Sequence, residues 1–171
     1  MQVMFGAAAL SAFKSSKLLL NLQARLPQVE AFSAQFAHFL DCTEELTNHD
    51  LEVIHALLLY GASFTSSTES ENTVLSLSRV VVPRPGTISP WSSKASDILH
   101  NCGLAKVERV ERGTVFTVQL SRPLETAELA ILDDMLHDRM TQEILSDVSK
   151  ASCLFRHAEP QAMAAVDILG Q

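Results

Sequence analysis

The N-terminal third of the chain alternates between the hydrophobic spacings of strands and helices. Residues 1–5 and 29–40 have the two-residue alternation of β-strands. Between them, residues 11–24 have apolar positions at helical spacing, and Ser11 is a suitable N-cap. A second helix is expected over residues 47–60.

The pattern continues with a strand and a helix that are separated by a loop. Residues 73–82 are rich in β-branched residues and predict a strand. The acidic, Ser/Thr-rich segment 65–73 before it reads as a surface loop. The next helix is expected over residues 91–102, with Ser92 or Ser93 as its cap.

Two further strands and a helix complete the predicted elements. Residues 106–111 and 114–120 alternate as strands, and Arg112-Gly113 between them suggests a short hairpin turn. Residues 124–140 read as a helix with Thr126 as a possible cap. This order predicts an α+β fold in which helices lie on one face of an antiparallel or mixed sheet. The two similar strand-helix-strand halves suggest a duplication.

Composition and charge narrow the function classes. A chain of 171 residues with 47% hydrophobic residues is expected to form one ordinary domain. Its 13 Lys and Arg against 20 Asp and Glu, with no basic block, argue against a nucleic-acid partner. The three cysteines are far apart and odd in number, which favours a reducing cytoplasm over a disulfide framework or a zinc site. No apolar run approaches the roughly 20 residues of a membrane helix.

A loop with three prolines, Pro83, Pro85 and Pro90, carries the strongest candidate site. Each proline fixes its own φ and restricts the residue before it, so the loop is expected to be stiff. The loop and the helix start combine cations, hydroxyls and one tryptophan, namely Arg84, Thr87, Ser89, Trp91, Ser92, Ser93 and Lys94. A helix N-terminus with such neighbours suits a phosphate or carboxylate, although ordinary turn chemistry also explains these residues. The glycine spacing is not that of a Walker A loop.

Several stretches of the chain match one known family. Arg84-Pro-Gly-Thr-Ile-Ser-Pro-Trp-Ser-Ser-Lys-Ala95 is the longest of them. The others are Gly6–Phe13, Asp97-Ile98, His100–Leu104, Leu136–Thr141 and Val166–Gln171. In this order they closely resemble the N-terminal domain of large, single-chain phosphoribosylformylglycinamidine synthase.

The resemblance implies a fold, a reaction and a domain boundary. Residues 1–159 would form a domain similar to a fused pair of PurS-like units, the small accessory subunit of the multi-subunit enzyme. Residues 160–171 would begin the linker to a synthetase domain outside this chain. The family is an ATP-dependent glutamine amidotransferase that converts formylglycinamide ribonucleotide to formylglycinamidine ribonucleotide in purine biosynthesis. Its ATP and magnesium ligands and its glutaminase cysteine belong to later domains, so no cofactor and no activity are expected for this chain alone.

The resemblance also implies partners. The domain would dock on the synthetase and glutaminase domains of the same chain, couple their sites and support ammonia passage. We expect the Arg84–Lys94 loop to project toward the synthetase site. There it would either touch the phosphorylated substrate or brace the wall around it. The alternative is that Ile88 and Trp91 are only packing anchors at a domain interface.

No complete catalytic motif is recognisable in the sequence. Hydrolase, protease, zinc-binding and dinucleotide-binding signatures are missing. His137, Asp138 and Arg139 could form an acid-base group, but a polar helix end or an interdomain contact is the preferred interpretation. His38 shares a strand face with apolar residues and is interpreted as structural. The alternative function is a freestanding, ferredoxin-like or PurS-like binding or adaptor module with an anion-binding loop; a stand-alone enzyme has the least support.

Overall fold

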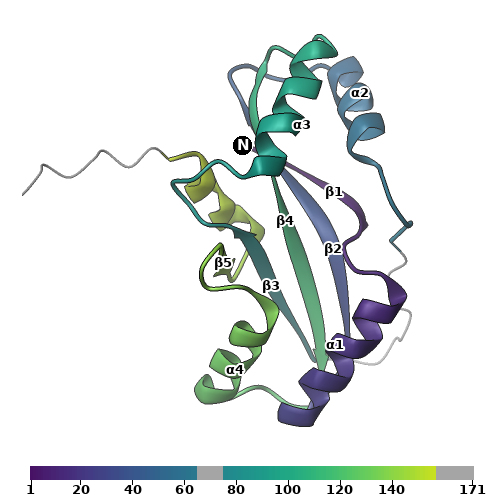
Figure 1. Cartoon of the computed structure of the whole chain (residues 1–171), viewed down its shortest axis with the longest axis vertical. Helices are drawn as coiled ribbons and strands as arrows, with labels where there is room; N and C mark the ends of the chain where they lie inside the picture. The colour runs from purple at the N-terminus through teal and green to yellow at the C-terminus, as the bar shows by residue number, and fades with distance from the viewer. Residues whose placement is uncertain (65–74, 157–171) are drawn as a thin grey trace, which may run out of the picture.

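The structure is a computed structural model that describes residues 1–64 and 75–156. These residues form a five-stranded antiparallel sheet of strand order β1-β2-β4-β3-β5 (Figure 1). The strands are β1 (Gln2–Ala8), β2 (Val29–Cys42), β3 (Leu75–Pro83), β4 (Val107–Leu120) and β5 (Gln142–Leu145). The helices are α1 (Ala12–Arg25), α2 (Asn48–Leu58), α3 (Pro90–Asn101), α4 (Thr126–Leu136) and the 3₁₀ helix η1 (Val148–Phe155). The predicted α+β class is confirmed.

The elements repeat as two βαβα halves, β1-α1-β2-α2 and β3-α3-β4-α4. The long strands β2 and β4 pair with each other at the centre. On the outer sides of this central pair, β1 pairs with the C-terminal part of β2, beginning at Gln2↔Leu40, and β3 pairs with the C-terminal part of β4, beginning at Leu75↔Leu120. As a result α1 and α4 lie at one end of the sheet, and α2 and α3 lie at the other (Figure 1).

The predicted hairpin turn at Arg112-Gly113 is wrong, because β4 runs without interruption through these residues. Its partner β2 is equally long and pairs with β4 throughout, including Ala37↔Gly113. Gly113 does not have a positive φ. A Cβ on it would lie 2.7 Å from the carbonyl oxygen of Val81 and 3.0 Å from Cε2 of Phe39. This glycine therefore permits a close approach of neighbouring strands.

Both faces of the sheet are covered. Val81 of β3 packs with Leu22 of α1 and Leu132 of α4. Its neighbour Val80 points to the opposite face and packs with Leu154 of η1. A third core lies under α2 and α3 and contains Leu40, Ile54, Leu58, Leu99, Leu104, Val107 and Val110. The α-helices thus share one face, as expected, and η1 covers part of the other.

The start of α3 differs from the prediction. Ser89 is the N-cap, and its hydroxyl accepts a hydrogen bond from the N–H of Ser92 at 3.0 Å. Pro90 occupies the first helical turn, where a missing N–H costs nothing. The predicted caps Ser92 and Ser93 therefore lie inside the helix.

The last α-helix is shorter than predicted. It begins at Thr126 with Glu125 as N-cap and ends at Leu136 instead of residue 140. Beyond it, the carboxylate of Asp138 accepts a hydrogen bond from the N–H of Met140 at 2.8 Å, which fixes a turn. Similarly, α2 ends at residue 58 instead of residue 60.

Two elements had no clear signal in the sequence. The four-residue strand β5 pairs with Val80–Pro83 of β3. The helix η1 follows it, capped by Asp147, whose carboxylate accepts from the N–H of Ser149. The predicted surface loop 65–73 and the predicted linker 160–171 lie outside the described residues.

Candidate functional site

The loop between β3 and α3 begins with a closed turn. The carbonyl of Arg84 accepts hydrogen bonds from the N–H of Thr87 at 3.3 Å and from its hydroxyl at 2.7 Å. Pro85 and Gly86, with φ of 81°, fit the two central positions of a type II turn. The N–H of Arg84 donates to the carbonyl of Thr141 at 3.1 Å, which ties the turn to the residue before β5.

The end of the loop is held by a buried carboxylate. Glu111 of β4 is fully buried and accepts hydrogen bonds from the N–H and the hydroxyl of Ser89 at 3.2 and 2.8 Å. The guanidinium of Arg109 donates to the same carboxylate from Nε at 3.2 Å. Glu111 therefore both fixes the N-cap of α3 and forms an ion pair with Arg109.

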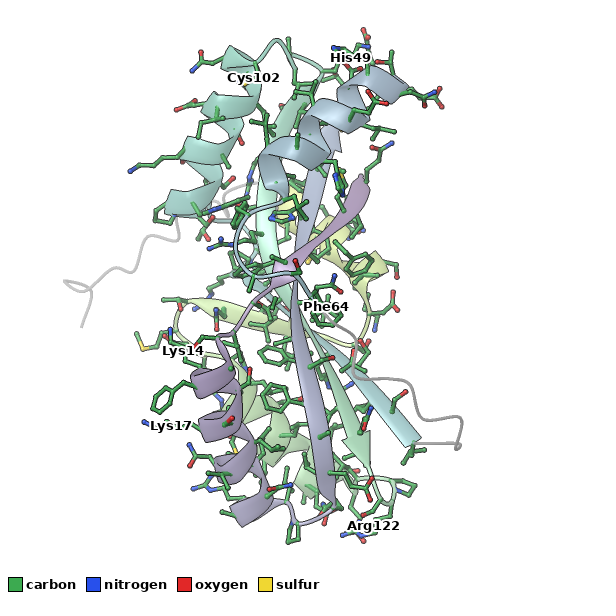
Figure 2. All side chains as sticks on the ribbon, turned by 90° about the vertical axis from the view of Figure 1, so that its right-hand side faces the viewer. Lys14, Lys17, His49, Phe64, Cys102 and Arg122 are labelled. Carbon is green, nitrogen blue, oxygen red and sulfur yellow. The ribbon has the colours of Figure 1, made fainter. Side chains whose placement is uncertain are left out.

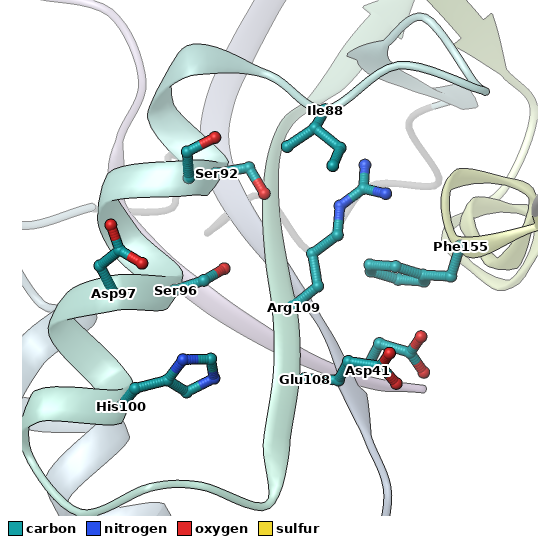
Figure 3. Close-up of a pocket in the computed structure, with 10 residues that line it drawn as sticks. Asp41, Ile88, Ser92, Ser96, Asp97, His100, Glu108, Arg109 and Phe155 are labelled. Atoms are coloured by element: carbon teal, nitrogen blue, oxygen red, sulfur yellow. The ribbon is translucent and has the colours of Figure 1, made fainter.

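Arg109 connects the loop to η1. One of its terminal nitrogens donates to the carbonyl of Thr87 at 2.8 Å. Its guanidinium also lies 5.5 Å from the ring centroid of Phe155, close enough for a cation–π contact (Figure 3). Sequence reasoning missed both Arg109 and Glu111. Opposite charges two residues apart on a strand were the available signal, since such residues share a face.

β3 pairs only with the C-terminal part of β4, and side chains of α3 lie along the edge of β4 that β3 leaves unpaired. The hydroxyl of Ser96 accepts a hydrogen bond from the N–H of Val110 at 3.1 Å. One turn later, Nε2 of His100 donates to the carbonyl of Val107 at 2.6 Å. Ser92 precedes them on the same helix face and is fully buried. Its hydroxyl has no hydrogen-bond partner among the described residues.

A cavity of about 380 Å³ opens along this edge, between α3 and η1 (Figure 3). It is lined by Asp41, Ile88, Ser92, Ser93, Ser96, Asp97, His100, Glu108, Arg109 and Phe155. The lining combines hydroxyls, carboxylates, one guanidinium, one imidazole and two apolar side chains. We call it the β4-edge cavity.

The other side of α3 holds a partly buried polar network around the buried His38. Tyr60 accepts a hydrogen bond from the guanidinium of Arg112 at 2.9 Å and lies 3.0 Å from Nε2 of His38. Nδ1 of His38 lies 3.3 Å from the carbonyl of Met4. Burial, helped by the charge of Arg112, lowers the pKa of His38 to about 4. A neutral His38 donates from Nδ1 and accepts the Tyr60 hydroxyl proton at Nε2, which satisfies both ring nitrogens and the Tyr60 hydroxyl.

Aromatic rings surround the cation of this network. The guanidinium of Arg112 lies 4.4 Å from the ring centroid of Phe36 and 4.8 Å from that of Trp91. The ring of His38 is 5.6 Å from that of Trp91. Gly6 is required here, because a Cβ on it would lie 2.7 Å from Cε1 of His38. The structural interpretation of His38 is consistent with this environment.

A second, mainly apolar cleft of about 230 Å³ lies between α2 and α3. It is lined by Leu57, Leu58, Tyr60, Trp91, Lys94, Ala95, Ile98 and Leu99. Ile98 remains 53% exposed at its rim.

The structure distributes the predicted loop residues over both sides of α3. Ser92 and Ser93 line the β4-edge cavity, whereas Trp91 and Lys94 line the apolar cleft. Thr87 and Ser89 serve the turn and the N-cap. Arg84 is exposed on the turn and is not part of either lining. The two predicted cations are thus not brought to one point.

The predicted polar group after α4 makes local contacts. Nδ1 of His137 lies 2.5 Å from the carbonyl of Asp133, one turn earlier. Asp138 fixes the following turn. Arg139 donates from Nε to the carboxylate of Asp134 at 3.0 Å and is largely exposed. These residues therefore close the helix end, and a contact with another domain stays a prediction.

Among residues 1–64 and 75–156, no group of three His, Cys, Asp or Glu side chains could hold a metal ion. In that range there is also no helix with the length and hydrophobicity needed to cross a bilayer.

A comparison with known protein families identifies a match. The model of the formylglycinamide ribonucleotide amidotransferase N-terminal region matches residues 35–155. The match includes the stretches Arg84–Ala95 and Leu136–Thr141 that carried the resemblance, whereas Gly6–Phe13 and Val166–Gln171 lie outside it. It spans well over half of the chain and confirms the assignment. The chain belongs to the family of N-terminal domains of formylglycinamide ribonucleotide amidotransferase, an enzyme of purine biosynthesis.

Proposed function

We propose that this domain acts within a longer cytoplasmic enzyme that converts formylglycinamide ribonucleotide, glutamine and ATP into formylglycinamidine ribonucleotide, glutamate, ADP and phosphate. Its part is to dock on the synthetase and glutaminase domains, to couple their sites and to support ammonia passage. ATP, magnesium and the glutaminase cysteine are assigned to those later domains, following the family resemblance. On this proposal the chain alone is inactive.

The observation that carries the docking role is the rigid surface around α3. The turn and the helix start are fixed from inside by Glu111. Large apolar side chains of this surface are exposed to solvent: Ile88 is 59% and Ile98 is 53% exposed. A pre-organised surface that leaves apolar side chains uncovered favours an interface with another domain.

The loop is also proposed to approach the ribonucleotide. Arg84 and Lys94 are exposed on either side of the helix start, and each could reach a phosphate. Replacing both by Ala in the full-length enzyme is expected to raise the apparent KM for the ribonucleotide about tenfold and to change kcat less. The matched control replaces Lys14 and Lys17 on α1, at the other end of the sheet (Figure 2). Unchanged kinetics in a folded enzyme would leave only the docking role.

The alternative is a freestanding binding module, and the mass of the native protein separates the two. An antibody against this chain should detect a species several-fold heavier than 18.7 kDa in extracts of the source. A band at the mass of the chain itself would reject the role within a longer enzyme.

A further inference from the structure

The β4-edge cavity carries a pattern of polar groups that the docking role does not use. Ser92, Ser96 and His100 follow each other at four-residue intervals on the side of α3 that faces β4 (Figure 3). Ser96 and His100 are bonded to the strand, but the hydroxyl of Ser92 has no partner among the described residues although it is fully buried. A buried hydroxyl without a partner is costly, and a ligand group in the cavity would supply one.

A second group in the cavity is also incompletely used. The hydrogen bonds of Arg109 within the described residues come from Nε and one terminal nitrogen. The other terminal nitrogen remains available to an anionic group. In Figure 3 the guanidinium points toward Ile88, at the end of the cavity where Ser92 lies. This end of the cavity therefore offers hydrogen-bond donors.

The opposite end is acidic. Asp41 and Glu108 lie away from the guanidinium, below the ring of Phe155, and Asp97 on α3 adds a third carboxylate to the lining (Figure 3). The charge of Arg109 is already balanced by the buried Glu111 behind it. The cavity is thus negative overall, with donors at one end and carboxylates at the other. A simple anion would be repelled by the carboxylates, and a simple cation would leave the hydroxyl of Ser92 and the unused terminal nitrogen of Arg109 without partners.

We propose that the β4-edge cavity binds a free α-amino acid, with a preference for basic side chains. The carboxylate of the ligand meets Ser92 and the free nitrogen of Arg109, and its ammonium group meets Asp41 and Glu108. The excess of carboxylates in the lining favours a second positive charge on the ligand. A volume of about 380 Å³ accommodates such a molecule against the ring of Phe155. The proposal does not depend on the docking role.

Calorimetric titration of the 171-residue chain with a matched ligand series tests this proposal. L-lysine is expected to bind with a dissociation constant of roughly 1 mM. Nα-acetyl-L-lysine lacks the α-ammonium group and cadaverine lacks the carboxylate, so each should bind about tenfold more weakly. L-glutamate should bind more weakly than L-lysine. Absence of L-lysine binding, or cadaverine binding as tightly as L-lysine, would overturn the proposal.

Two substitutions locate the site. Ser92→Ala removes a hydroxyl that has no partner in the described protein, so the melting temperature should stay the same or rise while L-lysine affinity falls several-fold. Asp41→Asn should weaken L-lysine to a similar extent. Ser16→Ala on α1, whose hydroxyl donates to Ala12, is the control and should change neither affinity nor folding. Unchanged affinity in both cavity variants would contradict the assignment, and the ligand series remains decisive if either variant does not fold.

Discussion

The two halves of the molecule connect a strand to a helix in different ways. In the first half Ala9–Ser11 lead directly from β1 to α1, and the hydroxyl of Ser11 accepts from the N–H of Lys14 at 3.4 Å. In the second half the longer segment Arg84–Ser89 closes a turn before α3 begins. Its N-cap Ser89 is bonded in addition to a buried carboxylate. Both helices have a serine cap, but only the second cap is part of a larger network.

The difference indicates what the fold requires. A short connection with one exposed cap is sufficient for a helix to return onto the sheet, as α1 shows. The buried pair of Glu111 and Arg109 is not an efficient source of stability, since apolar residues often serve as well at such positions. It holds one conformation of the Arg84–Ser89 loop and one orientation of Arg109. We infer that the second connection is elaborated for binding.

The substitution Glu111→Ala is expected to have the largest effect of those that test this comparison. The substitution leaves the guanidinium of Arg109 and the N–H of Ser89 without their partner in a buried place. We expect a loss of about 3–5 kcal/mol in the free energy of unfolding, measured with urea. The exposed neighbour Glu108 provides the control, and Glu108→Ala should stay within about 0.5 kcal/mol of the wild type. A loss below about 1 kcal/mol for Glu111→Ala would show that the network does not hold the loop.

Local sequence signals predicted most of the fold. The cap at Ser11 and the spacing of apolar residues in β2 and α3 depend on near neighbours, and they led to the right elements. The dipeptide Arg112-Gly113 suggested a turn, whereas its conformation depends on distant residues: β2 pairs with it on one side, and Val81 of β3 approaches Gly113 closely on the other. Helix α4 was drawn too long because Asp138 stops it through a turn that periodicity does not show.

The candidate site was predictable only in part. The stiffness of the Arg84–Lys94 loop follows from its prolines, but the position of its side chains depends on distant residues. Glu111 reaches Ser89 over 22 positions in the sequence, and Tyr60 reaches Arg112 over 52. Such contacts arise when the sheet assembles, so composition and periodicity carry no trace of them. The family resemblance pointed to this stretch without indicating the two cavities beside it.

The network on the other side of α3 predicts a pH dependence. Burial lowers the pKa of His38 to about 4, whereas the unfolded chain titrates near its ordinary value of 6.5. Between these two pH values the unfolded state binds a proton at His38 and the folded state does not. The free energy of unfolding therefore falls as the pH is lowered. The loss should approach about 3 kcal/mol near pH 4.

Urea unfolding between about pH 7 and pH 4.5 checks this dependence. The substitution His38→Gln should flatten the slope of the unfolding free energy in this window. The exposed His49 is the control, and His49→Gln should leave the slope as in the wild type (Figure 2). If both variants kept the wild-type slope, His38 would not be the group that titrates.

Substitutions of the two serine caps compare the two connections directly, and their expected effects are the smallest. Ser11→Ala removes an exposed cap with a long hydrogen bond and should cost about 0.5 kcal/mol. Ser89→Ala removes a cap and also the hydroxyl bond to Glu111, so about 2 kcal/mol is expected. In the Glu111→Ala background the loss from Ser89→Ala should shrink toward that of Ser11→Ala, because the shared bond is already gone. Equal losses for the two serines in the wild-type background would mean that the two connections are equivalent, and the argument for a specialised second half would fail.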